Sequence, residues 1–148
     1  MSVSVFIALL ALCCGYALWR GGAPERVAAA LQIGAFVLTL AAHRLFEGGF
    51  RSVDIGTAAI DLALLTALVV LAWRSTRFWP LWVGGWQLAA IIAHLAKMLD
   101  PNMMATGYAI QAQIWAYPML LATAAGAWRH QVRRRAGDAD PAWKPVPA

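Results

Sequence analysis

The sequence predicts an all-α fold, an integral membrane bundle of five transmembrane helices with the N-terminus outside and the C-terminus in the cytoplasm. Composition is the first reason: 61% of the 148 residues are hydrophobic and only 13% are charged, whereas a soluble protein averages about 25% charged residues. The second reason is that charged residues avoid four long stretches and thin out in a fifth. A mean hydropathy of +0.62 agrees with both. These features indicate a chain that lies in a lipid bilayer.

Each crossing of a bilayer requires about 20 predominantly apolar residues, and five such runs follow one another in the chain. The predicted spans cover residues 3–19, 27–46, 53–73, 79–99 and 104–128. Together they form one transmembrane domain, residues 1–130. Residues 131–148 are basic and then rich in proline, which predicts a disordered cytoplasmic tail.

The first apolar run is predicted to be a permanent helix and not a cleaved signal peptide. Its basic residues, Arg20 and Arg26, follow the run, whereas a secretory signal has its basic residues before the run. The sequence Gly-Gly-Ala-Pro at 21–24 separates it from the second run. Gly48 and Gly49 lie between the second run and the third. Paired glycines are typical of flexible loops, so they predict the joint between these two helices.

Polar turns delimit the remaining spans. Ser75 and Thr76 supply hydroxyls that can cap a helix N-terminus, and Pro80 fits the first turn of the fourth helix, where a missing N–H costs little. The sequence Asp-Pro-Asn at 100–102 ends the fourth run and turns the chain. Merging the last two runs would require a continuous helix through Pro101, so five crossings are predicted and not four.

Basic residues set the predicted orientation, because cytoplasmic segments of membrane proteins are rich in lysine and arginine. With the N-terminus outside, the cytoplasmic side holds Arg20, Arg26, Arg74, Arg77, Arg129, Arg133, Arg134, Arg135 and Lys144. The opposite side holds Arg44, Arg51 and Lys97. The tryptophans at the predicted inner interface are Trp19, Trp73, Trp79 and Trp128. The net charge of +5 is thus explained by topology, and no nucleic-acid partner is predicted.

Polar residues within the spans are the candidate functional residues, because such residues usually face other helices. In the fourth span, helical spacing puts Gln87 and His94 on one stripe, with Lys97 beside it. In the third span, Asp54 and Asp61 share a face. These stripes are expected to face the interior of the bundle.

Depth along the helices predicts where these groups meet. At a rise of about 1.5 Å per residue, Asp61, His94 and His43 all fall in the outer half of the membrane, and we expect them to converge there with Lys97. In the fifth span, Tyr108 and Gln111 share a face. The candidate residues for an ion, proton or ligand site are Asp61, His94, Lys97, His43, Asp54, Tyr108, Gln111 and Gln87.

Three interpretations of this cluster remain open. An Asp61–Lys97 or Asp61–His94 pair would fix the helix register without any turnover, since a partner lowers the cost of a carboxylate in lipid. The same groups could instead bind a proton, an ion or a small ligand. The third interpretation is haem b held between His43 and His94, although no cofactor is predicted. No catalytic residue is assigned, and no HExxH-type or clustered ligand spacing predicts a metal site.

Small residues at helical spacing predict close helix packing. Ala59, Ala63 and Ala67 form a ridge on the third span, and Ala122 with Gly126 repeats the small-xxx-small pattern on the fifth. Such ridges let two helix backbones approach each other.

The segments RSTRFWPLWVGGWQLAAIIAHLAKMLDP and YAIQAQIWAYPMLLATAAGAWRH carry a resemblance to a family. Over most of its length the chain resembles small uncharacterised multi-pass inner-membrane proteins of proteobacteria. The resemblance implies a multi-pass protein of the bacterial inner (cytoplasmic) membrane. It implies no catalytic residues, because no activity is attached to that group.

Together these features favour a non-enzymatic inner-membrane protein, a subunit or accessory of a larger membrane assembly. The first alternative is a small oligomeric carrier or channel with an intramembrane Asp/His/Lys proton or ion site. The second alternative is a haem- or quinone-linked membrane redox protein. The expected partners are the lipid bilayer and either further copies of the chain or other membrane subunits.

Overall fold

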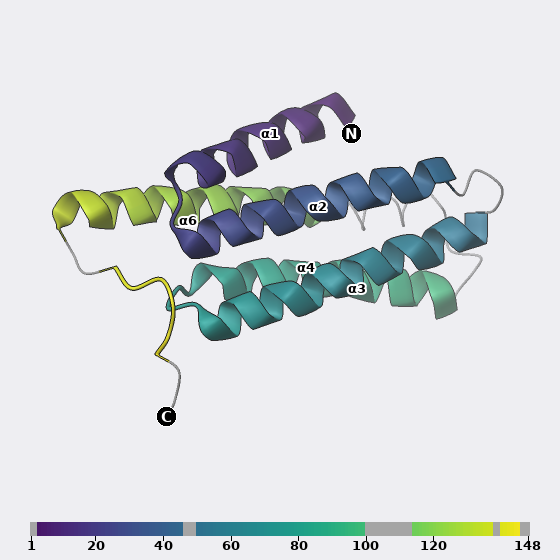
Figure 1. Cartoon of the computed structure of the whole chain (residues 1–148). Coiled ribbons are helices and arrows are strands. Elements are labelled where there is room, and N and C mark those ends of the chain that lie inside the picture. Colours follow the sequence, from purple (N-terminus) through teal and green to yellow (C-terminus); the bar gives the residue numbers. More distant parts are fainter. Residues whose placement is uncertain (1–2, 46–49, 100–113, 138–139, 146–148) are drawn as a thin grey trace.

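The computed structural model describes residues 3–45, 50–99, 114–137 and 140–145. For residue 45 and residues 50–54 it describes the backbone only. The described elements are five helices, shown in Figure 1. They are α1 (Val3–Arg20), α2 (Ala23–Leu45), α3 (Phe50–Arg74), α4 (Trp79–Leu99) and α6 (Ala116–Ala136). The prediction of an all-helical chain is confirmed for these residues.

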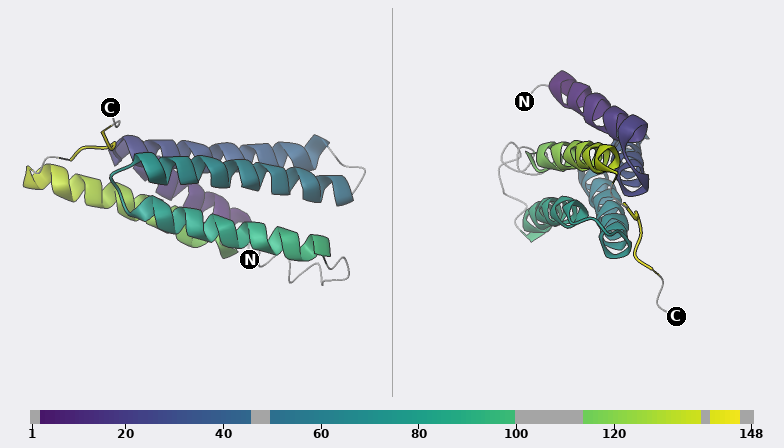
Figure 2. Two further views of the ribbon diagram at one scale, coloured as in Figure 1. Left: turned by 90° about the horizontal axis from the view of Figure 1, so that it is seen from below. Right: turned by 90° about the vertical axis from the view of Figure 1, so that its left-hand side faces the viewer.

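The helices form an antiparallel ring. Helix α1 packs against α2, α2 against α3, α3 against α4, α4 against α6, and α6 closes the ring on α1. An additional contact joins α2 to α6 across the ring. The end-on view in Figure 2 shows this arrangement, with α1 and α6 side by side. Because successive helices alternate in direction, one end of the bundle collects the C-termini of α1, α3 and α6 with the N-termini of α2 and α4 (Figure 1).

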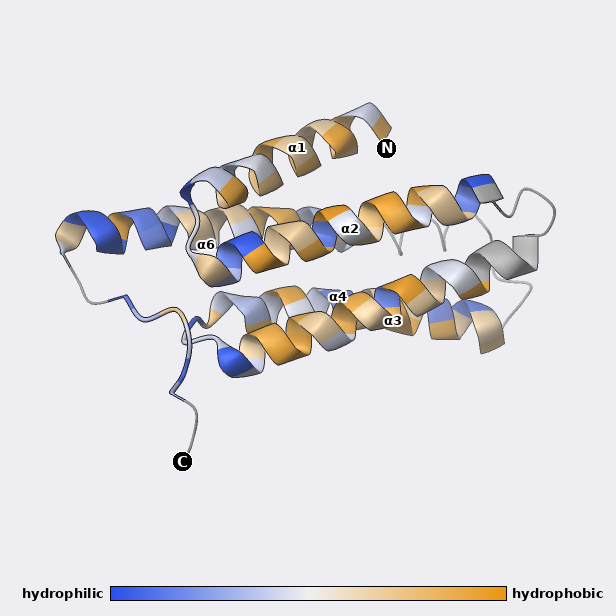
Figure 3. Ribbon diagram, in the orientation of Figure 1, coloured by the Kyte–Doolittle hydropathy of each residue, from blue (hydrophilic) through white to orange (hydrophobic). Residues whose placement is uncertain are grey.

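Three of the described helices are long and apolar enough to cross a membrane, judged by length and composition. The segments are Val3–Arg20, Ala23–Arg44 and Ile55–Arg74. Figure 3 shows that apolar residues dominate the middle of the bundle, whereas α6 becomes strongly hydrophilic towards its C-terminus. These helices support the prediction of a membrane protein.

Helix boundaries follow the local sequence. Helix α4 coincides with the predicted span 79–99, and Pro80 lies buried in its first turn. Helix α2 begins at Ala23, earlier than the predicted span, because Pro24 and Glu25 both suit a first turn. Proline loses no hydrogen bond there, and a carboxylate is favoured by the helix dipole.

The last helix differs from the prediction at its C-terminal end. Residues 104–113 of the predicted fifth span lie outside the described residues, but α6 continues past residue 128 to Ala136. Arginines 133–135 occupy its last turn, where positive charge is favoured by the dipole. Gly137 then ends the helix in the left-handed region at φ 74°, and its N–H donates to the carbonyls of Arg133 and Arg134. The tail expected from residue 131 is therefore helical up to Ala136.

Buried apolar side chains form two adjoining clusters, one centred on α1, α2 and α6 and the other on α2, α3 and α4. The first contains Leu10, Cys13, Cys14, Ala17, Ala29, Leu120 and Ala127. The second contains Ala28, Leu64, Leu68, Leu71, Val83 and Met119. The small residues in both clusters allow close helix packing.

The predicted small-residue ridges behave differently from each other. Gly126 is buried, and a Cβ placed on it would lie 2.7 Å from Nε1 of Trp79, so α4 and α6 meet closely there. Ala59 and Ala63, in contrast, are exposed on α3. Ala67 is half-buried, so it is the Ala59 and Ala63 part of the ridge that does not pack within this single chain.

Candidate functional site

Asp61 and His94 form a polar pair between α3 and α4. Nε2 of His94 lies 2.7 Å from Oδ2 of Asp61, within hydrogen-bond distance. The His94 side chain is only 5% exposed and that of Asp61 is 22% exposed. His94 precedes the C-terminal residue of α4 by about one and a half turns, so the pair lies in the half of the bundle away from the Arg20 end.

Gln87 supports the same helix contact two turns earlier on α4. Its side-chain Nε2 donates to the backbone carbonyl of Asp61 at 3.1 Å, and the side chain is buried. A backbone carbonyl inside a helix normally accepts one hydrogen bond, from an N–H of the same helix, but its oxygen can accept a second one. The additional bond from Gln87 therefore fixes α4 against α3. Asp61 is thus held at both its carboxylate and its carbonyl.

Of the other predicted site residues, the structure describes the side chains of Lys97 and His43. Lys97 is half-buried on α4. His43 is exposed on α2, so the predicted convergence of His43 with the buried His94 is not found. The reason is register: the neighbouring Ala42 occupies the buried position of that turn. The side chain of Asp54 and residues Tyr108 and Gln111 lie outside the described residues.

A second buried tie joins α2 to α6 across the ring. Nε2 of Gln32 donates to Oγ1 of Thr123 at 2.7 Å, and Thr123 donates in turn to the carbonyl of Met119 at 3.0 Å. Gln32 is 6% exposed and Thr123 is fully buried. Neither residue was in the predicted site, although a glutamine within an apolar span is the kind of signal that marks such a contact.

An imidazole and a carboxylate at this distance can share one proton. Either the pair is an ion pair, or a neutral imidazole donates to the carboxylate, and both states keep a hydrogen bond between α3 and α4. The geometry of Asp61 and His94 therefore serves as a structural tie and also permits proton binding.

The structure does not fit haem held by two histidines. His43 faces outwards, while Nε2 of His94, a ring nitrogen that an iron ligand would need, lies against Asp61. Within the described ranges, no group of three or more His, Cys, Asp or Glu side chains could hold a metal ion.

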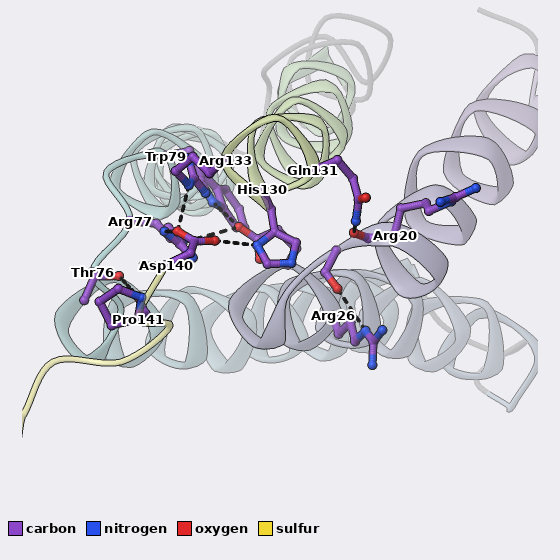
Figure 4. Close-up of polar contacts among 12 residues, drawn as sticks. Arg20, Arg26, Thr76, Arg77, Trp79, His130, Gln131, Arg133, Asp140 and Pro141 are labelled. Carbon is purple, nitrogen blue, oxygen red and sulfur yellow. Dashed lines mark hydrogen bonds and ion pairs between the residues drawn. The ribbon is translucent and has the colours of Figure 1, made fainter. Parts of the chain in front are cut away.

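A charged cluster that sequence reasoning missed lies at the opposite end of the bundle (Figure 4). Glu25, in the first turn of α2, is completely buried. Its Oε1 accepts a hydrogen bond from Nε1 of Trp79 at 3.1 Å, and Nε of Arg77 lies 3.9 Å from the same oxygen. Among the described residues, Oε2 of Glu25 has no hydrogen-bond partner. The Glu25 carboxylate is thus compensated by Arg77 of the α3–α4 loop and by Trp79, the first residue of α4.

Asp140 brings the segment after α6 into this cluster. Its Oδ1 accepts hydrogen bonds from Nη1 of Arg77 and, at 2.7 Å, from Nε of Arg133. Its Oδ2 lies 2.6 Å from Nδ1 of His130. Figure 4 shows the three partners converging on Asp140 from α6 and the α3–α4 loop.

Electrostatics explain why Asp140 stays ionised. Burial raises the pKa of its carboxyl, but hydrogen bonds from Arg77, His130 and Arg133 outweigh burial and lower the pKa from 3.8 to about 2. The carboxylate is therefore charged at every physiological pH, and it compensates the arginines around it.

Backbone hydrogen bonds hold the same segment against the α3–α4 loop. The N–H of Lys144 donates to the carbonyl of Arg74 at 2.8 Å, and the N–H of Thr76 donates to the carbonyl of Ala142 at 3.3 Å. An isolated antiparallel bridge pairs Ser75 with Trp143. Residues 140–145 were expected to be disordered, but they pack on the loop of residues 74–77 in an ordered way. This segment, residues 140–145, forms a clasp on that loop.

The clasp was missed because its signals are separated in the sequence. Asp140 stands alone in a polar segment, and its partners lie up to 63 residues away. The hydroxyls of Ser75 and Thr76, expected to cap α4, are used differently: Ser75 Oγ accepts from the N–H of Arg77 at 3.0 Å, and Thr76 Oγ1 donates to the carbonyl of Pro141.

Comparison of the chain with protein-family models, with curated proteins and with solved structures found no match.

Proposed function

We propose that the chain is a non-enzymatic, multi-pass protein of the bacterial inner membrane and acts as a subunit or accessory of a larger membrane assembly. In this proposal all five predicted runs cross the bilayer, the N-terminus is outside and the C-terminus is cytoplasmic. The inner-membrane location also rests on the family resemblance described above.

The ring of helices supports five crossings. Helix α4 is 21 residues long, and about 20 residues suffice to span the hydrocarbon core. The apolar part of α6, residues 116–128, is the described end of the predicted span 104–128. Both helices pack antiparallel within the same ring as the three candidate spans. A helix in that position shares the apolar environment of its neighbours.

Charge at the helix ends supports the orientation. Arg20, Arg74 and the arginines at 133–135 end α1, α3 and α6 at the same end of the bundle, and Arg26 begins α2 there. Cytoplasmic ends of membrane helices are enriched in such residues. The end that carries the clasp is therefore assigned to the cytoplasm.

The observation that carries the subunit role is the unpacked ridge of α3. Ala59 and Ala63 are exposed, although small residues at this spacing are typical of helix–helix interfaces in membranes. Interior polar groups, in contrast, are used to tie helices of the same chain together, as in Asp61–His94 and Gln32–Thr123. The ridge thus offers a helix from another copy or another subunit a close approach.

Photo-crosslinking in membranes tests this role. A photoreactive residue at Ala63 is expected to yield a discrete protein adduct, whereas the same residue at Leu38 on α2 or Leu121 on α6, both exposed, is expected to react with lipid. An adduct of twice the mass of the chain identifies a homo-oligomer, and any other discrete mass identifies a different subunit. Equal reaction with lipid at all three positions contradicts the proposal.

A second candidate function, a small oligomeric carrier or channel, is favoured by one observation. Asp61 keeps 22% of its side chain exposed while contacting the buried His94 at 2.7 Å. An ionisable pair inside a membrane span is a typical component of proton relays.

A further inference from the structure

Helices α1 and α6 enclose a groove at the arginine-rich end of the bundle. Its volume is about 230 Å³. It is lined by Tyr16, Trp19 and Arg20 of α1 and by Trp128, Gln131, Val132 and Arg135 of α6. The side chain of Gln131 donates to the carbonyl of Arg20 and joins the two helix ends (Figure 4).

The charge of Arg20 is held in a defined position in this groove. Cζ of its guanidinium lies 4.3 Å from the centroid of the Trp19 ring, a cation–π contact. Both Arg20 and Arg135 are exposed, and each comes from a different wall of the groove. One arginine from each wall thus lines the groove.

Both charged residues that line the groove are basic. None of its seven lining residues is acidic. The two described carboxylates at this end of the bundle are bound elsewhere, Glu25 by Trp79 and Asp140 by the arginines of the clasp. Guanidinium groups bind phosphate oxygens through paired, charge-assisted hydrogen bonds, so a phosphate is the anion that this geometry suits best.

The other walls of the groove are apolar and aromatic. Trp19 is 72% exposed and Trp128 is 60% exposed, so both rings present most of their surface to the surroundings. Tryptophan and tyrosine rings are enriched at the depth of lipid headgroups, where one part of the side chain meets hydrocarbon and another meets water. The volume is below the roughly 300–1,000 Å³ of pockets that enclose a whole small molecule. It therefore suits a headgroup whose acyl chains remain outside.

We infer that this groove binds the headgroup of an anionic phospholipid. The phosphate lies between Arg20 and Arg135, and the first acyl carbons lie against Trp19 and Trp128. This inference rests on the proposed membrane-spanning arrangement, because α1 must reach the headgroup region at Arg20. Lipid bound there would join the ends of α1 and α6.

Quenching of tryptophan fluorescence by brominated lipids tests the inference. The full chain in zwitterionic detergent micelles is titrated with phosphatidylglycerol or phosphatidylcholine, each brominated on the acyl chains. The signal of the groove is the quenching that is lost when Trp19 and Trp128 are both replaced by Phe. We expect that part of the signal to saturate at a several-fold lower concentration of phosphatidylglycerol than of phosphatidylcholine.

A charge-matched pair of variants separates the site from general attraction. Each arginine near an anionic surface contributes about fivefold in affinity wherever it lies. Arg20→Gln with Arg135→Gln, and Arg129→Gln with Arg134→Gln, remove the same charge, but only the first pair lines the groove. The groove variant is expected to lose about tenfold more affinity for phosphatidylglycerol than the control variant. Equal losses in the two variants overturn the inference.

Two further results distinguish a lipid phosphate from free phosphate, and a failure of the lipid site from a failure of the membrane arrangement. Excess inorganic phosphate is expected to leave the quenching by phosphatidylglycerol unchanged, and complete displacement would assign the groove to free phosphate and overturn the lipid site. Equal saturation by both lipids overturns the lipid site but leaves the membrane arrangement standing. If neither lipid quenches any tryptophan of the chain, the proposed membrane arrangement itself fails, and the inference fails with it.

Discussion

Nε1 of Trp79 donates a hydrogen bond to Oε1 of Glu25 at 3.1 Å, and this bond joins the first turn of α4 to the first turn of α2. The two residues are 54 positions apart in the sequence. Because Glu25 is fully buried, a loss of this donor leaves part of a carboxylate without compensation. The bond therefore makes the arginine-rich end of the bundle sensitive to small changes around Trp79.

Replacing Trp79 by Phe should destabilise the bundle. The ring is largely kept, but the indole N–H is lost, which costs about 1–3 kcal/mol when the acceptor is buried. The measurement is thermal unfolding in one detergent. Trp82→Phe is the matched control, because Trp82 is 55% exposed on the same helix. Equal melting temperatures for the two variants would contradict the role of the bond.

Gly126→Ala should displace the ring of Trp79 from the side of α6 and so destabilise the bundle. The new Cβ would lie 2.7 Å from Nε1 and 2.8 Å from Cε2 of Trp79, and forcing a methyl group into a packed site costs about 1–3 kcal/mol. The control is Gly85→Ala on α4, where nothing lies within 4 Å of the added atom. That substitution should be neutral or stabilising, since alanine is the better helix former. The prediction is refuted if Gly126→Ala melts at or above the temperature of Gly85→Ala.

Asp140→Asn should release the clasp without unfolding the helices. The substitution removes the charge that Arg77 and Arg133 bind. Hydrogen exchange should accelerate at the backbone N–H groups of Thr76 and Lys144, which are bonded across the clasp, while exchange in the middle of α3 stays slow. Lys144→Gln serves as a control, because it leaves Asp140 and both backbone bonds in place. Unchanged protection in Asp140→Asn would show that the clasp does not depend on this carboxylate.

Acid should release the clasp in the wild-type protein. The pKa of Asp140 is lowered to about 2 from 3.8, so its contribution to stability is complete above about pH 4 and is lost as the pH falls towards 2. Exchange at Lys144 should therefore be constant from neutral pH down to about pH 4, after correction for intrinsic rates, and should rise below it. The Asp140→Asn variant should lack this step. A wild-type step above pH 5 would assign the release to another group.

The pair of Asp61 and His94 distinguishes the two candidate functions. If the pair is a structural tie that keeps a single protonation state, the thermal stability of the wild type and of His94→Gln should vary with pH in parallel, with the variant lower throughout. If it is a working proton site, the wild type should show a stability step between about pH 5 and 8 that the variant lacks. The subunit proposal predicts parallel curves, and a step specific to the wild type would favour the carrier.

Reporter fusions test the number and direction of the crossings. Fusions after Ala148 and within the loop 74–77 should both report a cytoplasmic location, and a fusion at Gly48 should report the periplasm. The positive charge at the clasp end gives the physical reason for this orientation. A cytoplasmic signal at Gly48 would exclude the arrangement of five crossings.

The helices were largely predictable because their signals are local. Apolar runs, the proline in the first turn of α4 and the basic residues after α1 each lie within a few residues of the boundary that they define. The contact between Asp61 and His94 was also among the predicted pairings, because helix direction and depth restrict which residues can meet. The same reasoning gave a wrong position for His43, since a rotation of one residue about the helix moves a side chain by about 100°.

The clasp and the lipid groove were beyond sequence reasoning for a different reason. Each combines residues from segments far apart in the chain, such as Arg20 with Gln131, which are 111 positions apart. Their composition alone, arginines and tryptophans at helix ends, is explained equally well by membrane topology. Only the packing of α6 against α1 and against the α3–α4 loop assigns these residues to particular sites.

The closure of the ring by α6 on α1 bears on how the protein is made. Helix α1 ends at residue 20 and is synthesised before α6, which begins at residue 116 and is one of its two main neighbours. At about 5–20 residues per second, roughly 5–20 s pass between the two. During that interval the buried face of α1, with Cys13 and Cys14, has no α6 to cover it. That face therefore remains open to its surroundings until α6 is made and packs against it.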